Sequence, residues 1–248
     1  MGNKALKDLD LAGVQWELTE TALVCNTKKA PVQQNFSSVA NRLEQKNIIP
    51  ASAPITLSTI KSMVERPNDI ASLVRMVAEF NHPLRNGATQ VVMPNIAKES
   101  NGLIIITDMP STADDLSGNI LSGEAGEMID KMLSAIGMSR DTVSIIPLVF
   151  WRTPGGRTPT REEIDLAFPF VDKMINMLKP KIILTLGTLA ATEIAKTNLT
   201  TEHGKEIESD NGYKIIPIYH PNYLMLKPSA KKDVWSVLQN IQNMLKNQ

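Results

Sequence analysis

The sequence predicts a three-layer α/β/α sandwich built around a central four-stranded, mainly parallel sheet. Two observations favour this fold class. Unbroken apolar runs rich in β-branched residues are typical of strands buried on both faces of a sheet. Helical patterns separate these runs along the chain, as in parallel α/β proteins. The four runs are residues 103–107, 143–150, 181–187 and 213–220.

The helices are predicted from apolar residues at three- and four-residue spacing. Asp69 is placed to cap the first helix of the sandwich, because Ile70, Leu73, Val74 and Val77 then follow at this spacing. The remaining predicted helices cover residues 126–137, 161–178, 188–196 and about 229–245.

The first 59 residues differ from the rest of the chain. Apolar residues between Ala5 and about Val24 predict a helix, although their spacing is irregular. Residues 28–58 are rich in Gln, Asn, Ser, Ala and Pro and end in PASAPIT, which favours a flexible polar segment. We therefore expect an N-terminal region over residues 1–59 and one compact domain over residues 60–248.

Composition limits the classes of function. Lysine plus arginine and aspartate plus glutamate number 26 each in 248 residues, so the net charge is zero and any DNA contact requires a local patch. The single cysteine, Cys25, excludes a disulfide framework within the chain and a site of several thiolates. No apolar run reaches the ~18 residues of a membrane span. We expect a cytoplasmic monomer that binds no membrane.

In parallel sheets, ligands bind at the carboxyl ends of the strands, so function is sought just after each run. Three such ends carry polar residues: TDMPS from Thr107, WRTPGGRTP from Trp151, and HPN from His220. The chain contains neither GxxxxGK[ST] nor GxGxxG, which argues against a nucleotide-phosphate site of either type.

Three longer segments resemble one protein family. RTPGGRTPTREEIDLAFPFVDKMINMLKPKIILTLG, from Arg152, is similar to RPPGNRTPTPEEI…PFLERQIELLKPKVIVALG of the family-four uracil-DNA glycosylases. YHPNYLMLKPSAKKDVWSVL, from Tyr219, resembles that family's YHPSALLRNPELKREAWEDL. SGNILSGEAGEMIDKMLSAIGM, from Ser117, resembles its TGRPFVGRAGQLLDKML. The similarity spans residues 74–245 in constant order, which favours the uracil-DNA glycosylase fold.

The resemblance implies a protein that captures a deaminated base turned out of DNA and cleaves its bond to the sugar. His220 matches the histidine of the family's second motif, where the ring donates to the departing base. Asp108 falls at the acidic position of the first motif, GEAPG, and is expected as a weak auxiliary for the attacking water. From the residues alone, a hydrogen-bonded histidine at a strand end and an aspartate in an ordinary turn remain alternatives.

The resemblance also implies a base pocket, formed here by Met109, Pro110, Leu121 and Pro147. Leu121 takes the place of the phenylalanine that stacks on uracil. Pro147 takes the place of the asparagine that reads its edge, and proline has no side-chain donor or acceptor. Discrimination in such sites depends on those hydrogen bonds, so we expect eroded specificity for uracil.

Members of this family usually hold an iron–sulfur cluster on four cysteines. The matching positions here are Glu79, His82, Trp151 and Ala167. Because one distant thiol cannot replace four ligands, we predict no cluster, no other cofactor and no metal site.

DNA contacts are expected from two loops. In the family the loop after the HPN motif enters the minor groove, so Tyr223 or Leu224 is a candidate wedge and the lysines are candidate phosphate contacts. A solvated helix beginning at the lysines is the alternative. The candidate DNA-binding residues are Arg152, Arg157, Asn222, Tyr223, Leu224, Lys227 and Lys231.

Three functions remain open from the sequence. The first is a DNA-repair protein that binds DNA and hydrolyses the N-glycosidic bond of a deaminated base such as uracil. The second is a catalytically degenerate protein of the same fold that serves as a DNA- or partner-binding module. The third, an α/β enzyme acting on small nucleotides, requires a closed pocket without a wedge loop.

Overall fold

The computed structural model describes residues 16–19, 22–25 and 56–246. Contacts between residues group the chain into two units, Met1–Pro54 and Ile55–Gln248. In the first unit, β1 (Trp16–Thr19) and β2 (Ala22–Cys25) pair antiparallel, with Trp16 opposite Cys25. The helix predicted up to Val24 is therefore wrong over these residues. Apolar and polar residues alternate in Trp16–Thr19, which is a strand pattern, and Ala22–Cys25 is a short apolar run.

The second unit is built on a twisted sheet in the order β4-β3-β5-β7-β6. Its four predicted strands are parallel: β3 (Leu103–Thr107), β4 (Ser144–Pro147), β5 (Ile182–Leu186) and β7 (Lys214–Ile218). A fifth strand, β6 (Ile207–Glu208), pairs antiparallel with β7. The prediction of four strands is thus corrected to five. A two-residue edge strand in a polar stretch has no periodicity that reveals it.

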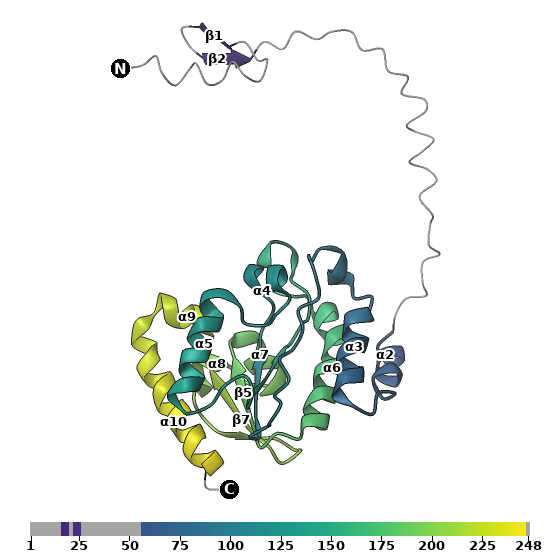
Figure 1. The fold of residues 1–248 in the computed structure, drawn as a ribbon, viewed down its shortest axis with the longest axis vertical. Coiled ribbons are helices and arrows are strands. Elements are labelled where there is room, and N and C mark those ends of the chain that lie inside the picture. Colours follow the sequence, from purple (N-terminus) through teal and green to yellow (C-terminus); the bar gives the residue numbers. More distant parts are fainter. Residues whose placement is uncertain (1–15, 20–21, 26–55, 247–248) are drawn as a thin grey trace. The chain divides into compact units, whose positions relative to one another are not determined.

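Helices cover both faces of this sheet (Figure 1). One layer contains α2 (Leu57–Val64), α3 (Ile70–Glu79), α6 (Arg161–Leu178) and α7 (Thr188–Ile194), and the other contains α5 (Gly123–Ala135), α9 (Pro221–Leu226) and α10 (Lys231–Lys246). Alternate residues of β3 serve the two cores, since Ile104 and Ile106 face the first layer while Leu103 and Ile105 face the second. The three-layer α/β/α prediction is confirmed.

Short elements connect these layers near the ends of the strands. They are α4 (Thr112–Ser117), α8 (Leu199–Glu202) and the 3-10 turns Pro83–Asn86, Pro154–Gly156 and Pro228–Ala230. Within the described residues, no helix has both the length and the apolar character needed to cross a membrane.

The beginning of the second unit is set by α2. The Thr56 hydroxyl accepts a hydrogen bond from the Thr59 amide, which caps the helix, and Ile60 is fully buried in the core that α6 shares. The helix therefore begins at Leu57 and runs across the boundary of 59/60 expected from the sequence.

Candidate active site

The carboxyl ends of the parallel strands bring the predicted site residues to one edge of the sheet. Thr107 at the end of β3 lies beside both Pro147 and Leu186 in the sheet register. Beyond the strands, the amide of Leu148 donates to the Thr107 carbonyl at 2.8 Å, and the amide of Gly187 donates to the Ile218 carbonyl at 3.0 Å. Asp108, Pro147 and His220 consequently belong to the same edge.

His220 ends the β7 segment and caps α9. Its Nδ1 accepts a hydrogen bond from the Asn222 amide at 3.2 Å, so a neutral ring carries its proton on Nε2. Burial lowers the pKa of His220 to about 4, while the charge of Asp114 acts in the opposite direction. At neutral pH His220 is therefore an uncharged imidazole with one N–H donor.

Asp114 is a site residue that the sequence reasoning missed. It is almost fully buried and accepts hydrogen bonds from the amides of Ser111 at 2.8 Å and Ser122 at 2.5 Å. It thereby ties the loop after β3 to the loop that carries Leu121, and its charge acts on His220. The Ser-x-x-Asp spacing of the α4 capping box was the signal that could have revealed its first role.

Asp108 lies where β3 meets the start of α7. Its Oδ1 accepts a hydrogen bond from the Ala190 amide at 2.6 Å, and a side chain at Gly187 would place a Cβ 2.3 Å from its Oδ2. Burial raises the pKa of Asp108 to about 6, against the opposing hydrogen bonds from the Ala190 and Leu189 amides. Asp108 thus holds two elements together and titrates close to neutral pH.

The four predicted pocket residues occupy constrained positions. Leu121 is buried with φ at 50°, and its carbonyl accepts a hydrogen bond from Arg140 Nη2 at 2.7 Å. Gly126 admits that carbonyl, because a Cβ there would lie 1.9 Å from it. Pro110 and Pro147 are buried. Met109 Sδ lies 3.5 Å from the Thr153 hydroxyl, which connects the pocket to the TPGGRTP loop.

Arg157 in that loop is held by an acidic partner within the chain. Its guanidinium donates to both carboxylate oxygens of Glu163, at 2.8 and 2.6 Å. The Arg157 hydrogen bonds, with a further contribution from Thr160, lower the pKa of Glu163 to about 2. Arg157 therefore supports the start of α6 through its bonds to Glu163. The side chain of Arg152, which precedes it in the same loop, is partly buried.

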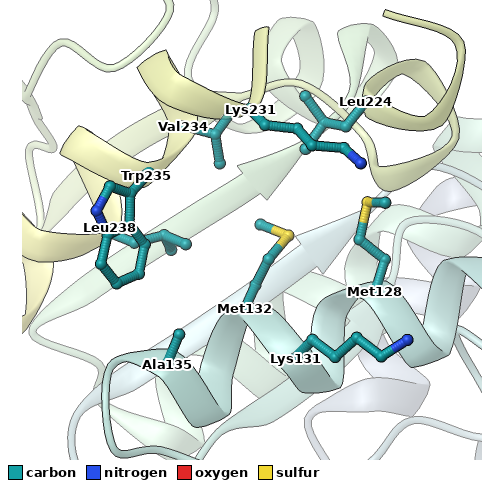
Figure 2. A pocket seen from close by; sticks show the side chains of 9 residues that line it. All are labelled: Met128, Lys131, Met132, Ala135, Leu224, Lys231, Val234, Trp235 and Leu238. Atoms are coloured by element: carbon teal, nitrogen blue, oxygen red, sulfur yellow. The ribbon is translucent and has the colours of Figure 1, made fainter. Parts of the chain in front are cut away.

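The loop after His220 differs from the expected arrangement in one residue. Leu224 is 1% exposed and points into a groove of about 320 Å³ between α5 and α10, so the candidate wedge role does not fit its position (Figure 2). The exposed apolar side chains here are Leu226, at 86%, and Tyr223, at 39%. Spacing from His220 could not reveal this, because packing of α9 on its neighbours decides which side chain faces solvent.

The positions that match the cluster cysteines contain close-packed side chains. The His82 ring stacks on Trp151 with centroids 4.4 Å apart, and Phe80 and Phe170 pack beside them. His82 Nε2 bonds to the Glu163 carbonyl at 2.9 Å, and its Nδ1 accepts from the Leu84 amide. Both nitrogens are used, and no thiolate is present. These residues do not fit an iron–sulfur cluster.

More generally, the part of the chain that the structure describes contains no group of three His, Cys, Asp or Glu side chains arranged to hold a metal ion.

The fold and the candidate site define an α/β protein with its candidate site residues at the carboxyl edge of a mainly parallel sheet. A family model for the uracil DNA glycosylase superfamily matches residues 94–241, more than half of the chain. The chain belongs to the uracil-DNA glycosylase superfamily.

Curated relatives agree with this family. A type-4 uracil-DNA glycosylase of Archaeoglobus fulgidus is 27% identical over 158 residues, which cover 60% of this chain and 79% of the relative. One from Thermotoga maritima is 30% identical over 146 residues, covering 58% and 76%. One from Pyrobaculum aerophilum is 27% identical over 150 residues, covering 56% and 76%.

Proposed function

We propose that this protein binds DNA and hydrolyses the N-glycosidic bond of a deaminated base. The observation that carries the proposal is His220, a neutral ring with a defined Nε2–H donor at the carboxyl edge of the sheet. The curated relatives are named as uracil-DNA glycosylases, which supports the same reaction class.

Hydrolysis breaks the bond between the sugar carbon and the base nitrogen, and the electron pair leaves with the base. Negative charge therefore develops on the ring nitrogen and the carbonyl oxygens of the departing base as water adds to the sugar carbon. A fixed hydrogen-bond donor aimed at that oxygen lowers the barrier, because the interaction strengthens as charge develops. His220 supplies this donor without the need to be protonated, since its pKa is far below neutral.

Asp108 is the proposed auxiliary for water. A carboxylate with a pKa of about 6 is largely ionised at pH 7.5 and accepts a proton readily near neutrality. Its Oδ1 accepts from the Ala190 amide, and in this proposal Oδ2, which lies against Gly187, is the oxygen that accepts from water. Asp108 therefore has both a structural and a chemical task in this proposal.

We propose that the reaction proceeds without an iron–sulfur cluster. The support is the chemistry of the matching positions, where His82 has both nitrogens bonded within the protein and Trp151 and Ala167 offer no ligand atoms. In this proposal the aromatic contacts of His82 with Trp151, and of Phe80 with Phe170 of α6, hold these segments together in place of a cluster.

The decisive experiment is a panel of single- and double-stranded oligonucleotides that carry uracil, hypoxanthine or xanthine, assayed for abasic sites. His220→Ala should lower single-turnover cleavage by about a hundredfold or more, because a donor to developing charge is lost, with DNA affinity nearly unchanged. His220→Gln, which keeps an N–H donor, should retain part of the rate. Cleavage unaffected by His220→Ala would mean that the chemistry lies on another residue.

A binding module without catalysis is the second candidate. The observation that favours it is Pro147, whose side chain cannot read a base edge, at a position buried beside Thr107. Wild-type protein that binds DNA yet cleaves no base in the panel would replace the enzymatic proposal with this one.

A further inference from the structure

The groove between α5 and α10 is apolar inside and basic at its rim (Figure 2). Its volume is about 320 Å³. Met128 and Met132 line it from α5, and Trp235 lines it from α10. Two lysines, Lys131 of α5 and Lys231 of α10, complete opposite walls, and none of the described residues that line the groove is acidic.

The groove keeps a large aromatic side chain partly in solvent. Trp235 is 40% exposed, whereas Trp151 in the same unit is fully buried. Apolar surface that the fold leaves uncovered marks contact sites for other molecules. Tryptophan contributes strongly to contacts between proteins, and flexible methionine side chains adapt to the shape of a partner. This composition suits a protein segment better than a phosphate backbone.

The two walls have the same spacing along their helices. The lining residues that stand at positions i, i+4 and i+7 are Met128, Met132 and Ala135 of α5, and Lys231, Trp235 and Leu238 of α10. The groove therefore follows both helices over about 10 Å, which is about two helical turns. A third helix laid along such a groove contributes its own apolar residues at three- and four-residue spacing.

The rim lysines determine which charge suits the groove. Lys231 forms no ion pair among the described residues. Lys131 lies 3.7 Å from Glu127, one helical turn earlier, and their side chains are 80% and 72% exposed. A pair of this kind contributes little and exchanges readily with another carboxylate. Acidic residues beside an apolar stripe are thus complementary to both rim lysines.

We propose that this groove binds an amphipathic helix of a partner protein, with the apolar stripe of that helix against Trp235 and the methionines and its acidic residues beside Lys131 and Lys231. The inference goes beyond the proposed glycosylase function and does not depend on catalysis. Leu224 also lines the groove, and its amide donates to the His220 carbonyl at 3.2 Å. The bound helix therefore packs behind the loop that follows His220.

The test selects binders for the full-length protein, without DNA, from a displayed library of random peptides of about 14 residues, or about four helical turns. Recovered peptides should be acidic and should carry apolar residues at helical spacing. Trp235→Ala should weaken their binding by about tenfold or more, as expected for an aromatic residue in the centre of a contact. Leu226→Ala is the matched control, because Leu226 is 86% exposed and does not line the groove. Thermal unfolding verifies that each variant is folded.

Reversal of the rim charge tests the acidic preference. The same library offered to Lys131→Glu with Lys231→Glu should return basic peptides in place of acidic ones, because the charge beside the apolar stripe is inverted. Lys98→Glu with Lys232→Glu makes the same change in net charge at two lysines that do not line the groove, and it should still return acidic peptides.

The outcomes separate this surface from the proposed function. Acidic peptides that require Trp235 and give way to basic ones on rim reversal support the proposal. It is overturned if no recovered peptide depends on Trp235, or if rim reversal leaves the recovered charge unchanged. Self-association that Trp235→Ala abolishes, seen by sedimentation without such peptides, assigns the groove to a second copy of the chain instead. Absence of base cleavage in a protein that binds these peptides overturns catalysis alone.

Discussion

The positions that match the family's cluster cysteines and the carboxyl edge of the sheet differ in how their polar side chains are held. At the first, His82 and Trp151 stack in a fully buried group that leaves both imidazole nitrogens bonded. At the second, burial lowers the pKa of His220 to about 4 and raises that of Asp108 to about 6. The first region is closely packed with its polar atoms bonded, whereas the second holds ionisable groups in an environment that disfavours their charged forms.

This difference indicates which region is the better candidate for function. Carboxylates with raised pKa values are common at functional sites, so the raised pKa of Asp108 favours a functional task beside its structural one. At the positions that match the family's cysteines, His82, Trp151 and Ala167 are buried, and Glu79 is exposed to solvent.

The largest effect is expected at Trp151. Trp151→Ala should lower the free energy of unfolding by about 3–5 kcal/mol, because it removes a fully buried aromatic ring that contacts His82, Phe80 and Phe150. Trp151→Phe should cost much less, since the indole Nε1 has no hydrogen-bond partner in the described structure. Denaturant unfolding of the three proteins measures both differences.

The same preparation tests the proposed lack of a cluster. Iron analysis of protein purified without oxygen should find far less than one cluster per chain. Stoichiometric iron, or a Trp151→Ala variant as stable as wild type, would show that the aromatic packing has not replaced the cluster.

The next effect is expected at Asp108, where removal of the charge should stabilise the fold at neutral and higher pH. Its folded pKa of about 6 exceeds the unfolded value of 3.8, so the ionised form disfavours folding and the loss of stability accumulates as pH rises from about 4 through 6. Asp108→Asn keeps an acceptor for the Ala190 amide and removes the charge. It should be about 3 kcal/mol more stable than wild type at pH 8, with no gain below about pH 4.

Activity gives the complementary measurement. If Asp108 must be ionised to assist water, wild-type single-turnover cleavage should fall as pH drops through about 6, whereas His220 alone would place the decline near 4.

An Asp108→Asn variant less stable than wild type at every pH would contradict the proposed burial of a charged carboxyl.

The sequence predicted the parts of the fold that depend on long unbroken patterns. The runs that form β3, β4, β5 and β7 are apolar on both faces. Such a run predicts a buried strand whichever elements pack against it. It missed β6, which is a strand only because β7 supplies its partner.

The site was predicted in the same uneven way. The position of His220 at a strand end follows from chain order, but the burial of Leu224 depends on α5 and α10, which are distant in sequence. The stack of His203 on Tyr219 likewise joins residues from separate elements, and no spacing reveals it. Local order was therefore readable, whereas contacts between elements were not.

A moderate effect is expected from charge in the loop after His220. Reversal of both lysines, Lys227→Glu with Lys231→Glu, should weaken DNA binding about tenfold at low salt. The slope of the logarithm of the binding constant against the logarithm of salt concentration should become shallower by the amount expected for about two phosphate contacts. Lys98→Glu is the control, because Lys98 pairs with Asp141 before β3 and β4 begin and thus lies at the amino ends of the strands. Equal losses in both proteins would mean that this loop is not the DNA surface.

The smallest effect, and the most informative about specificity, is expected at Pro147. Pro147→Asn restores an amide that can both donate to and accept from a base edge, at a position that pairs with Thr107 beside Asp108. The ratio of kcat/KM for uracil over hypoxanthine should rise several-fold, while stability falls by about 1–2 kcal/mol because the amide is unpaired without substrate. Pro147→Ala removes the ring without adding the amide and should leave the ratio unchanged. A ratio that does not respond in a folded Pro147→Asn protein would show that the side chain at position 147 does not face the base. The hydrogen bonds that distinguish uracil would then have to come from another residue at the carboxyl edge of the sheet.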